Sequence, residues 1–375
     1  MQKLLLKPVR LLSLLALLNL GVAAAPRAAL ADIALGLAGP LTGSNAQNGL
    51  EMRVGMEAAI QDINSHGGVL HQKLVLLAED DGCDNRQAIS AAKRMVEHGI
   101  HFVYGHYCSG TTLVASPVYA ESGVLEITVS VGAMITDQGF DGLFRLNGRD
   151  SQQGRIMADF LAAHYAGQRL AIIADRSSYG VSLAAALRDP LVGQAAVPVV
   201  LEQSIDNGTK NFAAVIEQLK QARAEIVYFA GFPPEAGLLV KQAAQAGLKV
   251  QFFGGTALAN RQFWDIAGPS AEGMIFTFVG DATLLTTAHD ITAKLQARGL
   301  NPQGFTLYAY AAVQLFAAAI ERAQSTEPAA VAAELQDGGL ATVLGNVSFD
   351  ENGDYLTPNW RVYRWNGDGH FKYVD

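Results

Sequence analysis

The stretch from Phe102 to Thr112 reads FVYGHYCSGTT, and the interpretation of the whole chain starts from it. The apolar run Ile100–Tyr104 predicts a buried strand that ends at Gly105. The turn that follows carries a cysteine, a serine, two threonines and Gly110, and Leu113–Ala120 then has helical spacing. A strand end, a polar turn and a helix N-terminus direct backbone N–H groups and hydroxyls toward one point. That geometry suits a carboxylate or another anion.

The same hydroxyl residues have a simpler interpretation. Ser109 or Thr111 could cap the helix by accepting a hydrogen bond from its first free N–H groups. The stretch alone does not decide between a cap and an anion site, so the rest of the chain has to.

The size and composition of the chain set the first limits. A chain of 375 residues is long for one domain and predicts two, each with its own core. Hydrophobic residues make up 50% and charged residues 17%, which is typical of a globular protein. The net charge is −8 and no basic patch or stripe is present, so nucleic acid is not an expected partner.

The N-terminus has the pattern of a secretory signal peptide over residues 1–31. A basic segment precedes the apolar run Leu11–Ala25, and Ala29-Leu30-Ala31 gives a small-x-small cleavage site. A permanent membrane helix is disfavoured because the apolar run is shorter than a bilayer requires. We therefore expect cleavage and export to the periplasm.

Export affects how the two cysteines are interpreted. Cys83 and Cys108 both lie in the mature chain, and an even pair in an oxidising compartment favours one disulfide. A catalytic thiol and a metal site that uses His106 and Cys108 are the alternatives. The histidines show no ligand spacing, so we expect no metal and no cofactor.

The chain alternates strands and helices twice. The first series of apolar strands is Asp32–Ala38, Leu74–Ala78, Ile100–Tyr104 and Val124–Thr128, with helices predicted between them, including Leu50–Ser65 and Arg86–Glu97. The second series is Leu170–Ala174, Val197–Leu201, Ile226–Ala230, Gln251–Phe253 and Met274–Val279. Near-continuous apolar strands predict two α/β domains with parallel sheets covered on both faces.

Two other patterns carry less weight. Gly36-x-x-Gly39-x-x-x-Gly43 follows a strand, but its spacing fits neither a dinucleotide fingerprint nor a P-loop. Asp350–Asp354 resembles a calcium loop only in composition, so we expect a hairpin turn there. Phe144–Asp150 is interpreted as a short crossing segment and Phe305–Ala323 as a long helix.

With these elements placed, the mature chain resembles the periplasmic solute-binding proteins that include the branched-chain amino acid receptors of ABC importers. The matching motifs are Gly39-Pro40-Leu41-Thr42-Gly43, Asp62-Ile63-Asn64 with Gly67-Gly68, Asp80-Asp81-x-Cys83-Asp84, Gly105-His106-x-Cys108-Ser109, Asp175 with Tyr179-Gly180, Gly231-x-x-Pro234-Glu235, Ala267-Gly268-x-Ser270-Ala271-Glu272-Gly273, and Asp350-x-x-Gly353-Asp354.

The resemblance implies two doubly wound parallel-sheet lobes joined by a three-segment hinge, with the ligand cleft between them. One lobe would be residues 32–149 plus 280–358. The other would be residues 150–279 plus 359–375. Closure at the hinge would bury the ligand.

The resemblance also implies a set of ligand-binding residues. Ser109 would hold a ligand carboxylate, assisted by the loop from Ser130 to Gly132. The second lobe would supply the aromatic contacts Tyr179 and Phe232.

Three positions depart from the pattern of the amino acid receptors. Thr256 stands where those receptors usually place the glutamate that binds the ammonium, Gly132 where they place a threonine, and Asn48 where an aromatic residue is common. A buried ammonium without a carboxylate costs several kcal/mol. Asp150, Glu235 or the more remote Asp281 could supply the charge, although Asp150 could equally form a plain salt bridge with Arg149.

The resemblance implies a non-catalytic periplasmic receptor, not an enzyme. It would deliver a small amino acid of branched-chain type, or a related carboxylate, to an inner-membrane ABC permease. The alternatives are a ligand without an ammonium (an aromatic acid, a keto acid or an amide) and a periplasmic sensor of the same fold. Members of the family are usually monomers.

Overall fold

The computed structural model describes residues 31–192 and 196–374, and the predicted signal peptide lies outside them apart from Ala31. The first sheet contains β1 (Ile33–Gly39), β2 (Leu74–Asp80), β3 (Phe102–Gly105), β4 (Leu125–Thr128) and β5 (Leu143–Arg145). Its strand order is β2-β1-β3-β4-β5, and every pairing is parallel. The order reverses at β1, which is typical of a doubly wound sheet.

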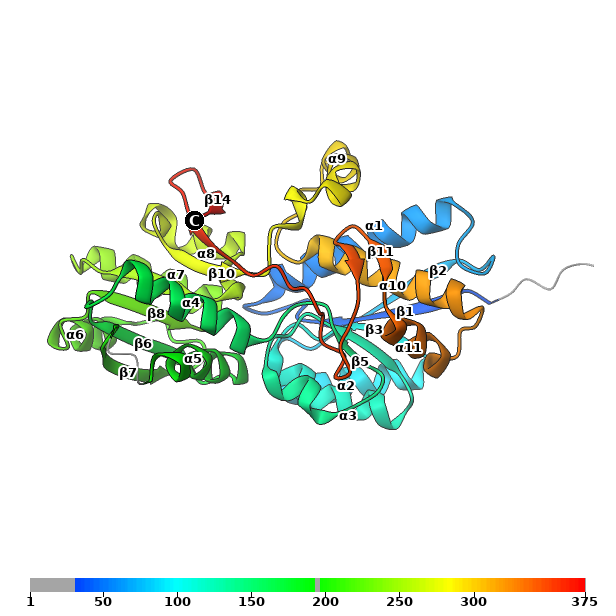
Figure 1. Ribbon diagram of the computed structural model, residues 1–375, viewed down its shortest axis with the longest axis horizontal. Coiled ribbons are helices and arrows are strands. Elements are labelled where there is room, and N and C mark those ends of the chain that lie inside the picture. Colours follow the sequence, from blue (N-terminus) through cyan, green and yellow to red (C-terminus); the bar gives the residue numbers. More distant parts are fainter. Residues whose placement is uncertain (1–30, 193–195, 375) are drawn as a thin grey trace, which may run out of the picture. The chain divides into compact units, whose positions relative to one another are not determined.

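Helices cover both faces of the first sheet (Figure 1). On one face, α1 (Ala46–Ser65) packs against α10 (Thr306–Ala323). On the other, α2 (Asn85–Glu97) packs against α3 (Ser109–Glu121). Because both faces are covered, β3 and β4 are buried along their whole lengths, as their apolar runs predict.

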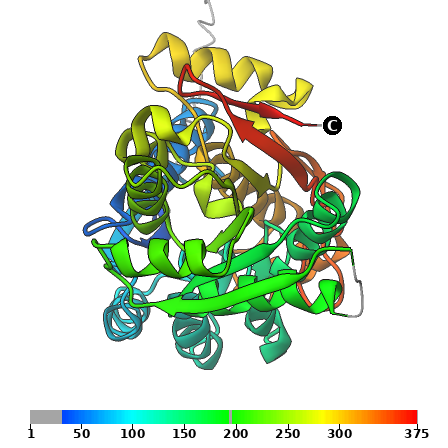
Figure 2. The same ribbon diagram turned by 90° about the vertical axis from the view of Figure 1, so that its left-hand side faces the viewer.

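The second sheet has seven strands in the order β14-β13-β10-β9-β8-β6-β7. The strands are β6 (Leu170–Asp175), β7 (Val199–Ile205), β8 (Ile226–Ala230), β9 (Gln251–Gly254), β10 (Ile275–Phe278), β13 (Arg361–Trp365) and β14 (Phe371–Tyr373). The pairings among β6 to β10 are parallel, while β13 and β14 add antiparallel pairings at the edge opposite to β7 (Figure 2). The prediction of a parallel sheet is confirmed for β6 to β10. The strands β13 and β14 make the sheet mixed at one edge.

The remaining helices are α4 (Asp150–His164), α5 (Ser178–Leu191), α6 (Ala213–Gln221), α7 (Pro233–Gln245), α8 (Arg261–Ala267), α9 (His289–Ala297) and α11 (Pro328–Asp337). Short 3-10 turns are η1 (Ala133–Gln138), η2 (Thr256–Leu258), η3 (Gly268–Ala271), η4 (Ala282–Leu284) and η5 (Thr286–Ala288). A small hairpin joins β11 (Leu340–Thr342) to β12 (Gly345–Val347).

The chain crosses between the two sheets after β5, after β10 and before β13. By their contacts, residues 32–375 form one compact unit that is not divided into lobes. The predicted lobe boundaries therefore stay predictions. The interpretation of Phe144–Asp150 as a crossing segment is partly wrong. Leu143–Arg145 is a strand of the first sheet, and α4 begins at Asp150. The prediction missed the strand because three residues are too few to show a periodic pattern.

The turn predicted at Asp350–Asp354 is present. The Asp350 N–H donates to the Asp354 carbonyl at 2.8 Å, and Phe349 and Tyr355 form an isolated antiparallel bridge. Gly353 has a φ of +81° and a Cβ there would lie 2.2 Å from the Leu143 carbonyl oxygen, so the position requires glycine.

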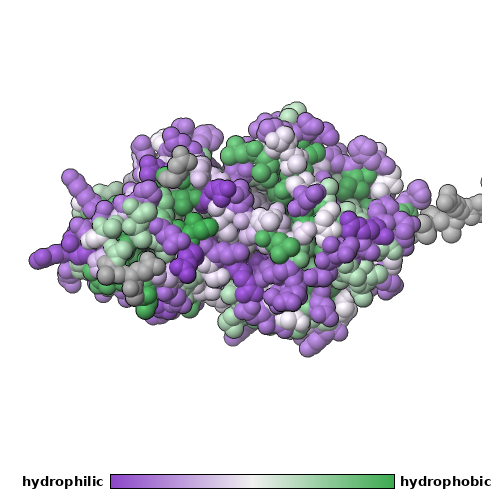
Figure 3. All heavy atoms as spheres, in the orientation of Figure 1, coloured by the Kyte–Doolittle hydropathy of each residue, from purple (hydrophilic) through white to green (hydrophobic). Residues whose placement is uncertain are grey.

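The face shown in Figure 3 is largely hydrophilic, interrupted by separate groups of hydrophobic atoms. No helix in the described ranges has both the length and the hydropathy of a membrane span.

Candidate ligand-binding site

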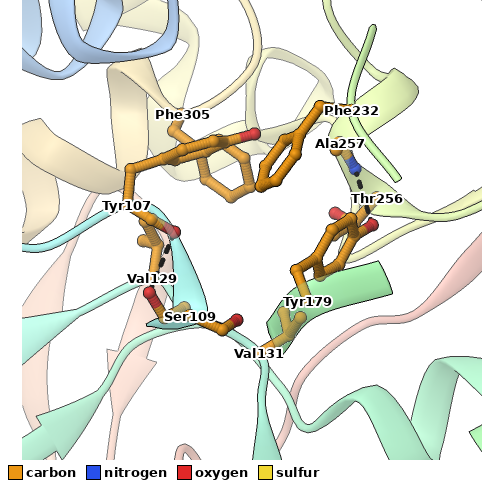
Figure 4. A pocket seen from close by; sticks show the side chains of 10 residues that line it. Tyr107, Ser109, Val129, Val131, Tyr179, Phe232, Thr256, Ala257 and Phe305 are labelled. Carbon is orange, nitrogen blue, oxygen red and sulfur yellow. Dashed lines mark hydrogen bonds between the residues drawn. The ribbon is translucent and has the colours of Figure 1, made fainter. Parts of the chain in front are cut away.

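A cavity lies where the strand-end loops of the two sheets meet (Figure 4). Its lining comes from loops after β3, β4, β6, β8 and β9, and from the segment before α10. These residues are Tyr107, Ser109, Val129, Ser130, Val131, Tyr179, Phe232, Thr256, Ala257 and Phe305. Ligands of doubly wound sheets bind beyond the carboxyl ends of the strands, so this cavity has the expected position.

Ser109 is the first residue of α3 and lines the cavity. Cys108 occupies the N-cap position and no side chain caps the helix, so neither Ser109 nor Thr111 has the capping role that we considered. The Thr111 hydroxyl donates to the Cys108 carbonyl at 2.8 Å. Ser109 Oγ accepts a weak bond from the Gly132 N–H at 3.3 Å, which leaves its own hydroxyl hydrogen for a ligand.

Ser130 also lines the cavity, but its hydroxyl is engaged with the protein. Ser130 Oγ lies 2.9 Å from the carbonyl oxygens of both His106 and Tyr107, and 2.5 Å from Thr112 Oγ1. A hydroxyl has one hydrogen to donate. The Ser130 side chain therefore joins the turn after β3 to the turn after β4, and Ser109 is the freer donor of the two.

The loop from Ser130 to Gly132 is held from behind by Arg145, a fully buried residue that the sequence analysis did not single out. Arg145 Nη1 donates to the carbonyls of Gly132 at 2.8 Å and Ser130 at 3.3 Å, and Nε donates to Asp354 at 2.6 Å. Burial lowers the pKa of Arg145, while the Asp354 carboxylate opposes that shift. The sequence did contain a signal for the role of Arg145, because it is a charged residue between the apolar Phe144 and Leu146.

The disulfide between Cys83 and Cys108 is present, with the two Cα atoms 5.7 Å apart. It ties the turn after β2 to the turn that leads into α3. Beside it, His106 Nδ1 lies 2.5 Å from Asp81 Oδ2, and both side chains are fully buried. In the described ranges, no group of three or more histidine, cysteine, aspartate or glutamate residues is placed to hold a metal ion.

Aromatic residues from both sides of the cavity form an aromatic wall, with Tyr179 and Phe232 on the side of the second sheet. The Tyr179 ring lies 5.2 Å from the Phe232 ring, and the Tyr107 ring lies 6.3 Å from Phe232 and 5.7 Å from Phe305, measured between ring centroids. The Tyr179 hydroxyl accepts a hydrogen bond from the Ala257 N–H at 3.3 Å. Burial raises the pKa of Tyr179, so the hydroxyl is neutral near pH 7.

Thr256 lines the cavity at the end of β9. Its N–H donates to Gln153 Oε1 at 3.1 Å, and its side-chain Oγ1 is buried with no hydrogen-bond partner in the structure. A buried hydroxyl without a partner is costly, so Thr256 is a further polar group available to a ligand.

The other predicted site residues lie outside the lining of the cavity. The Gly132 N–H contacts Ser109, and a Cβ at Gly132 would lie 3.2 Å from the Ser109 Cβ. Asn48 accepts a hydrogen bond from Asn260 at 2.6 Å. Asp150 is buried and accepts from the Ser182 hydroxyl, while its own N–H donates to the Val131 carbonyl at 2.8 Å.

The acids that we considered as replacements for the ammonium-binding glutamate each accept hydrogen bonds from groups outside the cavity lining. Burial raises the pKa of Asp150, which the Ser182 hydroxyl opposes. Glu235 accepts from the Gly208 N–H at 2.6 Å, and Asp281 accepts from Thr283. Arg149 pairs with Asp354 and Asp137 instead of Asp150. The cavity lining therefore contains no charged side chain.

Sequence reasoning did not name five of the lining residues individually, although Val131 lies in the predicted loop from Ser130 to Gly132. Val129, Val131 and Ala257 flank predicted positions, and Tyr107 lies in the decisive stretch, so adjacency would have found these four. Phe305 had no local signal, because it comes from the segment before α10, far along the chain from the other loops.

The family model for periplasmic binding proteins matches residues 32–370. The Leu/Ile/Val-binding protein homolog 1 of Brucella suis is 38% identical over 348 residues, which covers 92% of this chain and 94% of that protein. The chain therefore belongs to the periplasmic binding protein family, whose members bind solutes.

Two solved structures share the fold. The branched-chain amino acid transporter substrate-binding protein LivJ from Streptococcus pneumoniae, in complex with isoleucine, has a TM-score of 0.82 and 22% identity, and covers 92% of this chain and 99% of that chain. The solute-binding protein of an ABC transporter from R. palustris, in complex with benzoate, has a TM-score of 0.82 and 18% identity, and covers 92% of this chain and 95% of that chain. Their equal scores mean that the fold does not distinguish the two ligands.

Proposed function

We propose that this chain is the periplasmic substrate-binding component of an ABC importer and that it binds a small amino acid of branched-chain type. The observation that carries the proposal is the cavity itself, which combines a free Ser109 hydroxyl at the N-terminus of α3 with a wall of aromatic rings. The curated relative described above is a Leu/Ile/Val-binding protein homologue, which supports the same ligand class.

The ligand carboxylate would bind at Ser109. The Ser109 hydroxyl donates, the N-terminus of α3 contributes a favourable partial positive charge, and the Arg145-supported loop from Ser130 to Gly132 forms the adjoining wall. A hydrogen bond to a charged group is worth about 1.5–3 kcal/mol.

The apolar side chain of the ligand would pack among Tyr179, Phe232, Phe305 and Tyr107. The lining between the polar groups is aromatic and aliphatic, so it suits an aliphatic or aromatic body. Burial of such a side chain contributes about 1.5–3 kcal/mol.

Binding would close the two lobes about the hinge, and the closed form would be recognised by the permease. Two hydrogen bonds join residues of the two proposed lobes. Asn260 donates to Asn48 at 2.6 Å, and Gln262 Nε2 donates to the Ser44 carbonyl at 2.8 Å. These two bonds are candidates for the latch of the closed form.

A second candidate is a carboxylate without an ammonium, such as a keto acid or an aromatic acid. The absence of a charged side chain from the lining and the presence of Thr256 at the end of β9 favour it. The benzoate complex of a protein with the same fold supports it as well.

A thermal-shift experiment on purified residues 32–375 tests both candidates. One ligand set is the aliphatic and aromatic amino acids, and the other is their keto-acid, aromatic-acid and amide analogues. A ligand that binds only the folded state raises the melting temperature by mass action. A shift with leucine, isoleucine or valine supports the first candidate, a shift only with the second set supports the other, and no shift with either set contradicts the proposed function.

A further inference from the structure

An amino acid ligand carries an ammonium group, and the cavity lining offers it no negative charge. If the ligand is the amino acid of the proposed function, on which this inference rests, an acid outside the lining has to supply that charge. An ammonium that is moved from water into a protein interior needs a carboxylate partner, or the cost of desolvation is not offset.

Glu51 is a buried acid on α1 whose hydrogen-bonding capacity is only half used. It is 4% exposed. Its Oε1 accepts from Gln47 Nε2 at 3.0 Å and from Gln303 Nε2 at 3.1 Å. Its Oε2 is buried with no hydrogen-bond partner, and no salt bridge in the described ranges includes Glu51.

Glu51 lies directly behind the wall of the cavity. It adjoins Gly304, the residue before Phe305, the backbone of Phe305 opposes the rise in its pKa, and Phe305 lines the cavity. Tyr107, another lining residue, is close enough to Glu51 for its pKa to be raised by that carboxylate, after the larger effects of burial and of Tyr179.

The free oxygen of Glu51 faces the border between the two lobes. A Cβ on Gly304 would lie 2.4 Å from Glu51 Oε2 and 3.6 Å from the carbonyl oxygen of Ala259, so both oxygens adjoin the same point. Ala259 follows the lining residues Thr256 and Ala257 in the chain. Gly304 leaves the space beside Oε2 free of a side chain, and a larger residue there would collide with the carboxylate.

We propose that Glu51 supplies the negative charge that the amine of the ligand requires, acting from behind the Phe305 wall in place of the acid that is absent at Thr256. It is a specificity-determining residue: it favours a ligand with an ammonium over the same carboxylate without one. Asn48 lies one turn earlier on α1 with an unused Nδ2 donor, so this part of the cleft can also hold polar atoms of a ligand.

The electrostatics of Glu51 give the proposal a direct signature. Burial raises the pKa of Glu51 to about 8, although its bonds from Gln47, Gln303 and Phe305 oppose the shift, so the ligand-free group is mostly protonated at neutral pH. The groups that face it are the amides of Gln47 and Gln303, the backbone of Gly304 and Phe305, the Ala259 carbonyl and the Tyr107 phenol. Tyr107 stays neutral because its own pKa is raised. An arriving ammonium would therefore ionise Glu51 and release a proton.

The other buried acids near the first sheet do not fit the role. Glu126 on β4 is as deeply buried and its pKa is likewise raised by burial to about 8. Neither of its carboxylate oxygens has a hydrogen-bond partner among the described residues. The neighbours that oppose its pKa shift are Ser116 on α3 and the backbone of His106, so it lies on the face of the sheet opposite to α1. Glu126 therefore provides a matched control.

The test is isothermal titration calorimetry near pH 7, in two buffers of different ionisation enthalpy, with leucine and with its keto acid, 4-methyl-2-oxopentanoate. For the natural sequence we expect leucine to release close to one proton, because a group with a pKa near 8 is about nine-tenths protonated there and becomes ionised. The keto acid should release none.

The Glu51→Gln variant keeps an oxygen for the bonds from Gln47 and Gln303 but cannot ionise. It should bind leucine about 10- to 100-fold more weakly, the effect of losing a charge roughly 6–12 Å from the ammonium, behind the Phe305 wall, at an effective dielectric constant near 20. It should release no proton and bind the keto acid as before. Glu126→Gln should behave like the natural sequence with both ligands.

Several outcomes would overturn the proposal. Leucine binding without proton release, or with the same release in Glu51→Gln, would show that another group meets the ammonium while the amino acid function stands. Binding of the keto acid alone would overturn the role of Glu51 and favour the second candidate function. Binding of neither ligand would contradict the proposed function itself and the role of Glu51 with it.

Discussion

The two sides of the cavity are built by different means. On the side of the first sheet, Ser109, Ser130 and Gly132 are positioned by hydrogen bonds, by a disulfide and by a buried arginine that pairs with Asp354. On the side of the second sheet, Tyr179 and Phe232 are positioned mainly by contacts between rings. Hydrogen-bonded and charged networks have one low-energy arrangement, whereas packed rings tolerate small shifts. The first side is therefore suited to the invariant carboxylate of a ligand, and the second to a variable side chain.

The largest effect is expected from Arg145→Met. The substitution leaves Asp354 with Arg149 as its remaining cationic partner and removes the support of the Ser130 and Gly132 carbonyls. Breaking a buried ion pair costs about 3–5 kcal/mol, so the free energy of unfolding measured in urea should fall by that amount. The matched control is Arg176→Met, whose exposed pair with Asp206 should contribute within about 0.5 kcal/mol. Equal losses in the two variants would contradict the role of Arg145.

The next effect concerns the disulfide on the same side. Cys83 and Cys108 are 25 residues apart, and closing a loop of that length contributes roughly 3 kcal/mol in the chain-entropy treatment. A variant with serine at both positions should melt at a lower temperature. A reducing agent should lower the melting temperature of the natural sequence and leave the double variant unchanged. A double variant as stable as the natural sequence would contradict this prediction.

Ser109→Ala tests the carboxylate end of the cavity. It should weaken the binding of any carboxylate ligand by about 1.5–3 kcal/mol, which is about 10- to 100-fold in Kd, because the alanine cannot donate to the carboxylate. Ser116→Ala is the control, since Ser116 is on the same helix but donates to the Thr112 carbonyl and does not line the cavity. Calorimetry that gives the same Kd for Ser109→Ala and the natural sequence would remove Ser109 from the site.

Tyr179→Phe should have the smallest effect. It removes the hydroxyl that accepts from the Ala257 N–H at 3.3 Å and keeps the ring against Phe232. The loss of one neutral hydrogen bond costs about 0.5–1.5 kcal/mol, so Kd should rise only a few-fold. Tyr165→Phe, whose ring packs on Phe253 away from the cavity lining, is the control. A loss of affinity as large as that of Ser109→Ala would mean that the second side also binds by specific polar contacts.

The sequence by itself determined the fold class and the general position of the site. Continuous apolar runs such as Phe102–Gly105 form buried parallel strands, because both faces of the sheet are covered and no polar face is needed. Parallel strands bring their carboxyl ends to one edge, so the loops with Ser109, Ser130, Tyr179, Phe232 and Thr256 had to lie near one another within each sheet. These are consequences of local pattern and of chain direction alone.

The tertiary structure decided which polar groups are free and which are occupied. Arg145 meets Asp354 from 209 residues away, and this contact fixes the loop beside Ser109. The Ser130 hydroxyl is occupied by carbonyls of another turn, Asp150 is held by Ser182, and Glu51 keeps one oxygen without a partner. The availability of a group depends on neighbours that are distant in sequence and on burial, neither of which leaves a mark in local composition. For that reason the sequence could predict Ser109 as the contact of a ligand carboxylate, while only the three-dimensional arrangement singled out Glu51.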